Sequence, residues 1–219
     1  YGAKATIVMP TTTPLIKVNR TKGYGAEVVL YGDVYDEACA KAYELAEEHG
    51  YTFVHPFDDL TVATGQGTIA MEIVKELPLV DYILVPIGGG GLAASVACWL
   101  KKFWPHIKVI GVEGVDQASM KTSIEQGHRV NLDYVDVFCD GTAVHIPGEL
   151  TYPLCRELID EFVTVTNNEV CQAIRAMWES SRVVPEPSGA MSLAGFLKQW
   201  NEGEVKPDFR ATWLTVSSG

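Results

Sequence analysis

The chain has 219 residues, of which 47% are hydrophobic and 21% are charged, as in an ordinary soluble globular protein. Its formal net charge of −11 argues against nucleic acid as a partner, because phosphate contacts require clustered Lys and Arg. No apolar run reaches the roughly 18 residues of a membrane span, no segment reads as a signal peptide, and the five dispersed cysteines are typical of reduced thiols in a cytoplasmic protein.

Short β-rich runs alternate with helix-length segments in the first quarter of the chain. A polar stretch that closes at Gly23 is compatible with a helix. The Ala- and Glu-rich residues 34–49 predict a second helix, and Gly50 stands where a helix end favours a residue with positive φ. The strands expected around these helices are residues 5–9, 27–31 and 51–54.

Residues 55–67 have turn chemistry and few helix formers, so we expect an irregular crossing between two subdomains there. Beyond it, the expected strands are residues 81–87, 108–112 and 211–216. The expected helices are residues 68–77, 92–103, 188–200, and one from the capping box of Thr166 and Glu169 to about residue 180. Strands separated by helices indicate βαβ units, and therefore an α/β fold with an open, mainly parallel sheet and helices on both faces.

Four consecutive glycines, Gly88, Gly89, Gly90 and Gly91, follow an expected strand and, with Leu92, open a helix. Because glycines lack Cβ atoms, several backbone N–H groups can converge on one anion there, next to the positive end of the helix dipole. A P-loop is excluded because no G-K-[ST] follows, and a dinucleotide loop because the third spaced glycine is missing. The loop therefore predicts a phosphate site, with a tight structural turn as the alternative.

Five further segments have the spacing of a known set of motifs. They read Thr64-Gly65-Gln66-Gly67-Thr68, His55-Pro56-Phe57-Asp58-Asp59, Asp140-Gly141-Thr142-Ala143-Val144, Glu186-Pro187-Ser188-Gly189-Ala190 and Ser217-Ser218-Gly219. Together with the tetraglycine they resemble the fold-type II pyridoxal-phosphate (PLP) enzymes, in the branch of threonine dehydratase (threonine deaminase) and serine racemase. The resemblance implies a tryptophan-synthase-β-like fold, with residues 1–54 as part of the small subdomain and residues 55–219 as the large PLP-binding subdomain.

The same resemblance implies roles for individual residues. Residues 88–92 would hold the phosphate of PLP through backbone N–H groups, and Ser218 would hydrogen-bond its pyridine nitrogen. Glu186 and Gly141 would approach the cofactor, and Phe57 would line the substrate side. The implied reaction is β-elimination and deamination of L-threonine to 2-oxobutanoate and ammonia, as in isoleucine biosynthesis.

Two features of the family pattern are missing from this sequence. The family's Schiff-base lysine lies in an S-F-K-x-R-G-A segment, which does not occur here. We therefore expect this chain to lack the N-terminal segment with the lysine, to contain no catalytic residue, and to be inactive alone. A cation site of the serine racemase branch matches at Glu113, but its second carboxylate falls on Ser119, and Asp116 is an imperfect substitute, so no metal is expected.

Three functions therefore stay open. The first is a PLP-dependent threonine (serine) dehydratase represented by an incomplete core. The second is a serine racemase or another fold-type II amino-acid enzyme, and the third is a non-catalytic fragment that binds phosphate or other anions. The expected partner is an amino-acid substrate, without nucleic acid or membrane. The complete enzyme is expected to be a cytoplasmic homo-oligomer.

Overall fold

A computed structural model describes residues 2–203 and 211–217 of the chain. The chain separates into two compact units, Tyr1–Val54 and His55–Gly219. The first unit contains β1 (Thr6–Met9), α1 (Leu15–Gly23), β2 (Glu27–Leu30) and α2 (Tyr35–His49). Its two strands pair in parallel, with Thr6 opposite Glu27. As predicted, α2 ends at Gly50, which takes a φ of +68°.

The strand expected at residues 51–54 does not form. The backbone N–H of Tyr51 instead closes α2 by donating to the carbonyl of Ala46 at 2.9 Å. The ring of Phe53 stacks on Tyr43 of the same helix with the centroids 4.0 Å apart. The aromatic residues of this segment, Tyr51 and Phe53, therefore contact rings of the helix that precedes them, and the prediction of a strand was wrong.

The second unit is built around one parallel sheet. Its strands are β3 (Tyr82–Pro86), β4 (Lys108–Gly114), β5 (Glu161–Val165) and β6 (Trp213–Thr215). Their order in the sheet is β5-β4-β3-β6, and each neighbouring pair is parallel. Its helical elements are α3 (Leu60–Gln66), α4 (Thr68–Glu76), α5 (Gly91–Phe103), α6 (Ser119–Gln126), the 3-10 turn η1 (Asp140–Thr142), α7 (Thr151–Leu158), α8 (Asn167–Ser181) and α9 (Pro187–Glu202).

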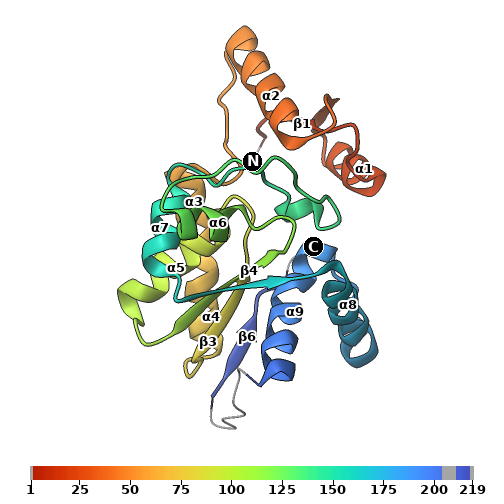
Figure 1. Cartoon of the computed structure of the whole chain (residues 1–219). Helices are drawn as coiled ribbons and strands as arrows, with labels where there is room; N and C mark the ends of the chain where they lie inside the picture. Colours follow the sequence, from red (N-terminus) through yellow and green to blue (C-terminus); the bar gives the residue numbers. More distant parts are fainter. Residues whose placement is uncertain (1, 204–210, 218–219) are drawn as a thin grey trace. The chain divides into compact units, whose positions relative to one another are not determined.

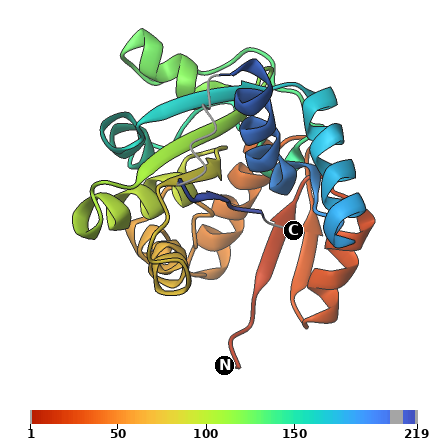
Figure 2. The same ribbon diagram turned by 90° about the horizontal axis from the view of Figure 1, so that it is seen from below.

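Helices cover both faces of this sheet, with α4, α5 and α7 on one face and α8 and α9 on the other (Figures 1 and 2). Successive side chains of a strand point to opposite faces. Ile83 and Val85 of β3 accordingly lie in the core beneath α4, α5 and α7, whereas Leu84 lies in the core beneath α8 and α9. This arrangement confirms the predicted α/β class with a parallel sheet between two helical layers.

Part of the segment expected to be irregular is a helix. Asp59 caps α3 at its start, because its carboxylate accepts hydrogen bonds from the N–H groups of Thr61 at 2.8 Å and Val62 at 2.9 Å. Gly67 ends α3 with right-handed backbone angles, and α4 begins at the next residue. The weak helix formers of this stretch are thus outweighed by a side-chain cap.

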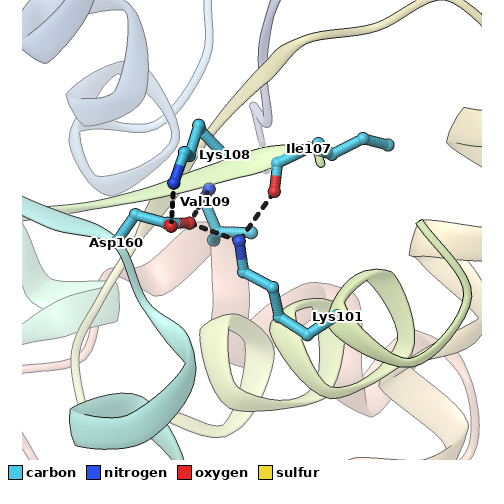
Figure 3. Close-up of polar contacts among 5 residues, drawn as sticks. All are labelled: Lys101, Ile107, Lys108, Val109 and Asp160. Atoms are coloured by element: carbon cyan, nitrogen blue, oxygen red, sulfur yellow. Dashed lines mark hydrogen bonds and ion pairs between the residues drawn. The ribbon is translucent and has the colours of Figure 1, made fainter. Parts of the chain in front are cut away.

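An ionic cluster closes the edge of the sheet at which β4 begins (Figure 3). The carboxylate of Asp160, in the turn between α7 and β5, accepts hydrogen bonds from Lys101 Nζ at 2.5 Å, Lys108 Nζ at 2.8 Å and the N–H of Val109 at 2.9 Å. Lys101 also donates to the carbonyl of Ile107 at 2.7 Å. The side chains of Lys101 and Asp160 are only 17% and 22% exposed, so this cluster ties α5, β4 and the α7–β5 turn together.

Candidate functional site

The four glycines form a sharp corner between β3 and α5, and we refer to residues 88–91 as the glycine corner. β3 ends at Pro86, Ile87 continues its pairing to β4 through a 2.9 Å bond to the carbonyl of Val112, and α5 begins at Gly91. Gly90 stands at the N-cap of α5 with a φ of +95°. A residue with a side chain is strained in this region of backbone conformation, so the turn itself requires glycine at this position.

Close packing also excludes side chains from the glycine corner. A Cβ atom at Gly88 would lie 2.9 Å from the Cα atom of Thr142, and one at Gly89 would lie 2.3 Å from the ring of Phe57. At Gly90 it would lie 2.6 Å from Met120 Cε, and at Gly91 it would lie 2.8 Å from Phe57 Cβ. The backbone of the corner is thus enclosed by segments distant in sequence, which fix its conformation.

The backbone N–H groups of the corner are available to a ligand. In the described part of the chain, no hydrogen bond has the N–H of residues 88–92 as its donor, and no side chain caps α5. Gly89, Gly90 and Gly91 are nevertheless buried. Buried N–H groups without partners are costly, and at the start of a helix of thirteen residues they face the positive end of its dipole. An anion such as a phosphate group would satisfy them.

The turn η1 lies beside the glycine corner, as the contact between Thr142 and Gly88 requires. A Cβ atom at Gly141 would lie 2.9 Å from Ser188 Oγ and 3.3 Å from Glu186 Oε1, both at the start of α9. The structure therefore brings together Gly88, Gly141 and Glu186, three of the residues singled out in the sequence.

Gln117 holds η1 in place, although nothing in the sequence singled it out. Its side chain is only 3% exposed. Its amide nitrogen donates to the carbonyls of Asp136 at 2.5 Å and Cys139 at 3.1 Å, while its amide oxygen accepts from Thr142 Oγ1 at 3.2 Å. Since Thr142 packs directly on Gly88, Gln117 supports the corner through this turn.

We expect the Gln117→Leu substitution to lower the free energy of unfolding by about 1–3 kcal/mol, because it removes the hydrogen bonds of the buried Gln117 amide to Asp136, Cys139 and Thr142. Urea denaturation followed by circular dichroism measures this loss. The matched control is Gln126→Leu on the exposed end of α6, which should change stability by less than about 0.5 kcal/mol. Equal stability of the two variants would show that Gln117 does not hold the turn.

The segment from His55 to Asp59 supports the corner from the other side. The ring of Phe57 lies against Gly89, and its Cβ atom and backbone lie against Gly91. His55 Nδ1 accepts the N–H groups of Phe57 at 3.2 Å and Asp58 at 2.8 Å, and burial keeps the pKa of His55 below its usual value despite the neighbouring Asp58 and Asp59. A neutral His55 therefore shapes this turn.

Glu113 caps the beginning of the helix α6. Its carboxylate is 1% exposed and accepts the N–H groups of Met120 at 2.9 Å and Lys121 at 2.8 Å in the first turn of α6. Burial raises its pKa to about 8, although both hydrogen bonds oppose the rise. The neighbouring Ser119 Oγ is buried without a partner in the described part of the chain, and residues 2–203 and 211–217 contain no group of three His, Cys, Asp or Glu side chains that could hold a metal ion.

Ser218, predicted to meet the ring nitrogen of the cofactor, lies outside the described residues. The strand before it is described up to Val216, whose N–H donates to the carbonyl of Leu84 at 3.0 Å. Because β6 runs parallel to β3, Thr215 pairs with Leu84 in the strand that leads into the glycine corner. No helix in the described part of the chain is long and apolar enough to span a membrane.

Comparison with known proteins places these features in a family context. A family profile described as pyridoxal-phosphate dependent enzyme matches residues 1–219. The biosynthetic L-threonine dehydratase of Haemophilus influenzae is 46% identical over 205 residues, which cover 94% of this chain and 40% of that protein. The structure of processed threonine deaminase isoform 2 from Solanum lycopersicum is similar with a TM-score of 0.91 at 43% identity, covering 99% of this chain and 62% of that one.

The structure of maize serine racemase also has a TM-score of 0.91, at a lower identity of 29%, with 100% of this chain and 66% of that chain covered. The chain thus spans about 40% of the length of the curated bacterial relatives. The backbone fold is shared equally by the two kinds of structure, whereas the sequence is more similar to the threonine deaminase.

Proposed function

The chain belongs to the family of pyridoxal-phosphate dependent enzymes. We propose that it is part of a threonine dehydratase. In that enzyme L-threonine undergoes β-elimination and deamination to 2-oxobutanoate and ammonia. The identities of 45–50% with relatives named threonine dehydratase support this substrate. The observation that carries the proposal is the set of N–H groups at the glycine corner, where α5 begins, that have no hydrogen-bond partner among the described residues.

The residues present fit a cofactor that bears a phosphate. The N–H groups of residues 88–92 would hold that phosphate, and Phe57, Thr142 and Met120 leave no room for side chains at the corner. When bound, PLP supplies an electron-accepting ring that stabilises the negative charge left on the substrate after its α-proton is removed. The enclosing side chains would keep bulk water away from the corner and so strengthen its hydrogen bonds.

The remaining site residues are assigned within the same proposal. Glu186 and Gly141 would approach the cofactor, which is supported by the packing of Gly141 against Glu186 and Ser188 and of Thr142 against Gly88. Ser218 would meet the pyridine nitrogen, and Phe57 would line the substrate side. We assign no catalytic residue and no metal ligand to this chain.

The proposal extends to the organisation of the protein. Residues 1–54 would be part of the small subdomain and residues 55–219 the large PLP-binding one, which is supported by the division of the chain at Val54. The word "biosynthetic" in the names of the relatives supports a place in isoleucine biosynthesis. A cytoplasmic homo-oligomer with an amino-acid substrate completes the proposal.

An assay of the protein that carries this chain tests the reaction. With PLP and L-threonine we expect release of a 2-oxo acid and ammonia in equal amounts. The likeness to maize serine racemase makes amino-acid racemisation the second candidate, and formation of D-serine from L-serine without 2-oxo acid would favour it. Binding of phosphate without either reaction would leave an anion-binding module.

A further inference from the structure

The carbonyl group of Gly89 is clamped by two donors from the start of α7. Thr151 Oγ1 donates to it at 2.5 Å, and the N–H of Gly148 donates to it at 3.2 Å. Thr151 is fully buried. Its hydroxyl oxygen would also lie 2.9 Å from a Cβ atom at Gly90, so the side chain rests against both glycines of this peptide unit.

A clamped carbonyl determines where the next N–H group points. A trans peptide is planar, and its C=O and N–H groups point in opposite directions. The described part of the chain contains no cis peptide bond. With the Gly89 carbonyl turned toward Thr151, the N–H of Gly90 must point away from α7. That N–H is one of the buried donors for which residues 2–203 and 211–217 provide no acceptor.

The next peptide unit is fixed in the same way. The carbonyl of Gly90 accepts the N–H of Ala94 at 2.8 Å, which is the first hydrogen bond of α5. The N–H of Gly91 therefore points out of the beginning of the helix, as the first N–H groups of a helix do. Thr151 thus sets the orientation of the Gly90 N–H, which α5 itself does not orient.

Thr151 is in turn held by a carboxylate from a distant part of the chain. Asp58 accepts the N–H groups of Glu149 at 2.8 Å, Leu150 at 2.8 Å and Thr151 at 3.3 Å. Asp58 comes directly after Phe57, whose ring lies against Gly89. One short segment therefore both packs against the glycine corner and fixes the start of the helix that clamps it.

We propose that Thr151 is a positioning residue that aims the Gly90 N–H at the phosphate of the cofactor, and that Asp58 holds Thr151 in place for this task. This inference rests on the proposed function, since the anion is taken to be the phosphate of PLP. Thr151 touches neither cofactor nor substrate in this scheme. It acts through the Gly89–Gly90 peptide, whose rotation would withdraw one donor from the anion site.

Thr151→Val removes the hydroxyl and keeps the shape of the side chain. Titration of the chain with inorganic phosphate, followed by calorimetry, should give an affinity about tenfold weaker than that of the wild type, the loss of one hydrogen bond to a charged group. Thr151→Ser restores a hydroxyl and should bind within about twofold of the wild type. Rescue by serine separates orientation of the carbonyl from simple packing.

Ser123→Ala is the matched control, because Ser123 is fully buried and its hydroxyl bonds Ser119 and Val130, away from the corner. It should lose stability and keep its phosphate affinity. Wild-type affinity in a folded Thr151→Val protein, or an equal loss in Thr151→Ser, would overturn the inference. If Thr151→Val does not fold, Asp58→Asn replaces it, with an expected weakening of about threefold and unchanged affinity as the contrary result.

The outcomes also separate this inference from the proposed function. A wild-type chain that binds no phosphate contradicts the proposed function itself. A wild-type chain that binds phosphate as tightly as its Thr151→Val variant leaves the proposed function standing and contradicts the role of Thr151 alone.

Discussion

The Gly90→Ala variant is expected to lose phosphate binding and to be less stable than the wild type by between about 2 and 5 kcal/mol. A side chain at a φ of +95° adds about 1–2 kcal/mol of backbone strain. The new methyl group would lie 2.6 Å from Met120 Cε and 2.9 Å from Thr151 Oγ1, and such overpacking costs about 1–3 kcal/mol more. Relief of the contact by rotation of the Gly89–Gly90 peptide would turn the Gly90 N–H away from the anion. Urea denaturation and phosphate calorimetry measure the two effects.

Gly127 provides the control for backbone strain alone. It ends α6 with a φ of +77°, and nothing lies within 4 Å of a Cβ atom built there. Gly127→Ala should lose only about 1–2 kcal/mol and should bind phosphate as the wild type does. Equal destabilisation of the two variants would contradict the close packing around Gly90. Phosphate binding by the Gly90→Ala variant would contradict anion binding at the glycine corner.

The Asp160→Asn variant is expected to lose about 2 kcal/mol of stability, because hydrogen bonds to charged groups contribute about 1.5–3 kcal/mol and one acceptor oxygen is replaced by a donor. Lys101, whose side chain is only 17% exposed, would lose its carboxylate partner. The cluster lies where β4 begins, and the glycine corner lies where the parallel strand β3 ends, so the two lie at opposite ends of the sheet. Phosphate affinity should therefore stay unchanged. Chemical denaturation and calorimetry test both parts of this expectation.

The effect of Asp160 should also depend on pH. Burial opposes ionisation of this carboxyl, but the hydrogen bonds from Lys101, Lys108 and the Val109 N–H outweigh it and lower its pKa. A carboxyl with a lowered pKa stabilises the fold above its unfolded pKa of about 3.9, and this contribution disappears as the pH falls through the folded value. The wild type should therefore lose its advantage over Asp160→Asn only in acid.

An exposed ion pair offers the comparison. Arg175 and Glu179 pair on the surface of α8 at 2.8 Å, with side chains 77% and 57% exposed. Glu179→Gln should change stability by less than about 0.5 kcal/mol, because water screens such pairs. A loss as small as this in Asp160→Asn would mean that the cluster does not hold the edge of the sheet.

Much of the fold followed from local pattern. The continuous apolar run of β3, the capping box of Thr166 and Glu169 in front of α8, and Gly50 after α2 all gave elements where the structure has them. The parallel sheet followed from the alternation of strands and helices. The family was inferred from motifs spread over nearly the whole chain, and the match of residues 1–219 confirms it.

The missed elements depend on partners that lie outside the elements themselves. α6 begins where Glu113 accepts its first N–H groups, and α7 begins where Asp58 does the same from 91 residues away. β5 is a short strand whose pairing with β4 gives it its place. Local propensity does not encode such caps and pairings, although Pro153 near the start of α7 was a usable signal for a helix.

The candidate site also contains residues that local sequence predicts and residues that only the folded structure identifies. The glycine corner could be predicted because consecutive glycines after a buried strand are a local feature. Gln117 and Thr151 could not, since each acts through hydrogen bonds to Thr142 or Gly89 that only the folded chain brings within reach. The roles of Ser218, Glu186, Gly141 and Phe57 toward the cofactor remain predictions that follow from the family.

The central claim is that the backbone N–H groups of residues 88–92 bind the phosphate of the cofactor. Amide nitrogen–proton correlation spectra of the isotope-labelled chain, recorded during titration with inorganic phosphate, test it most directly. We expect the amide signals of Gly89, Gly90 and Gly91 to move the furthest and to saturate together, with a smaller response at Gly141. Saturable shifts confined to other residues, or glycine signals that stay fixed while phosphate binds, would contradict the account.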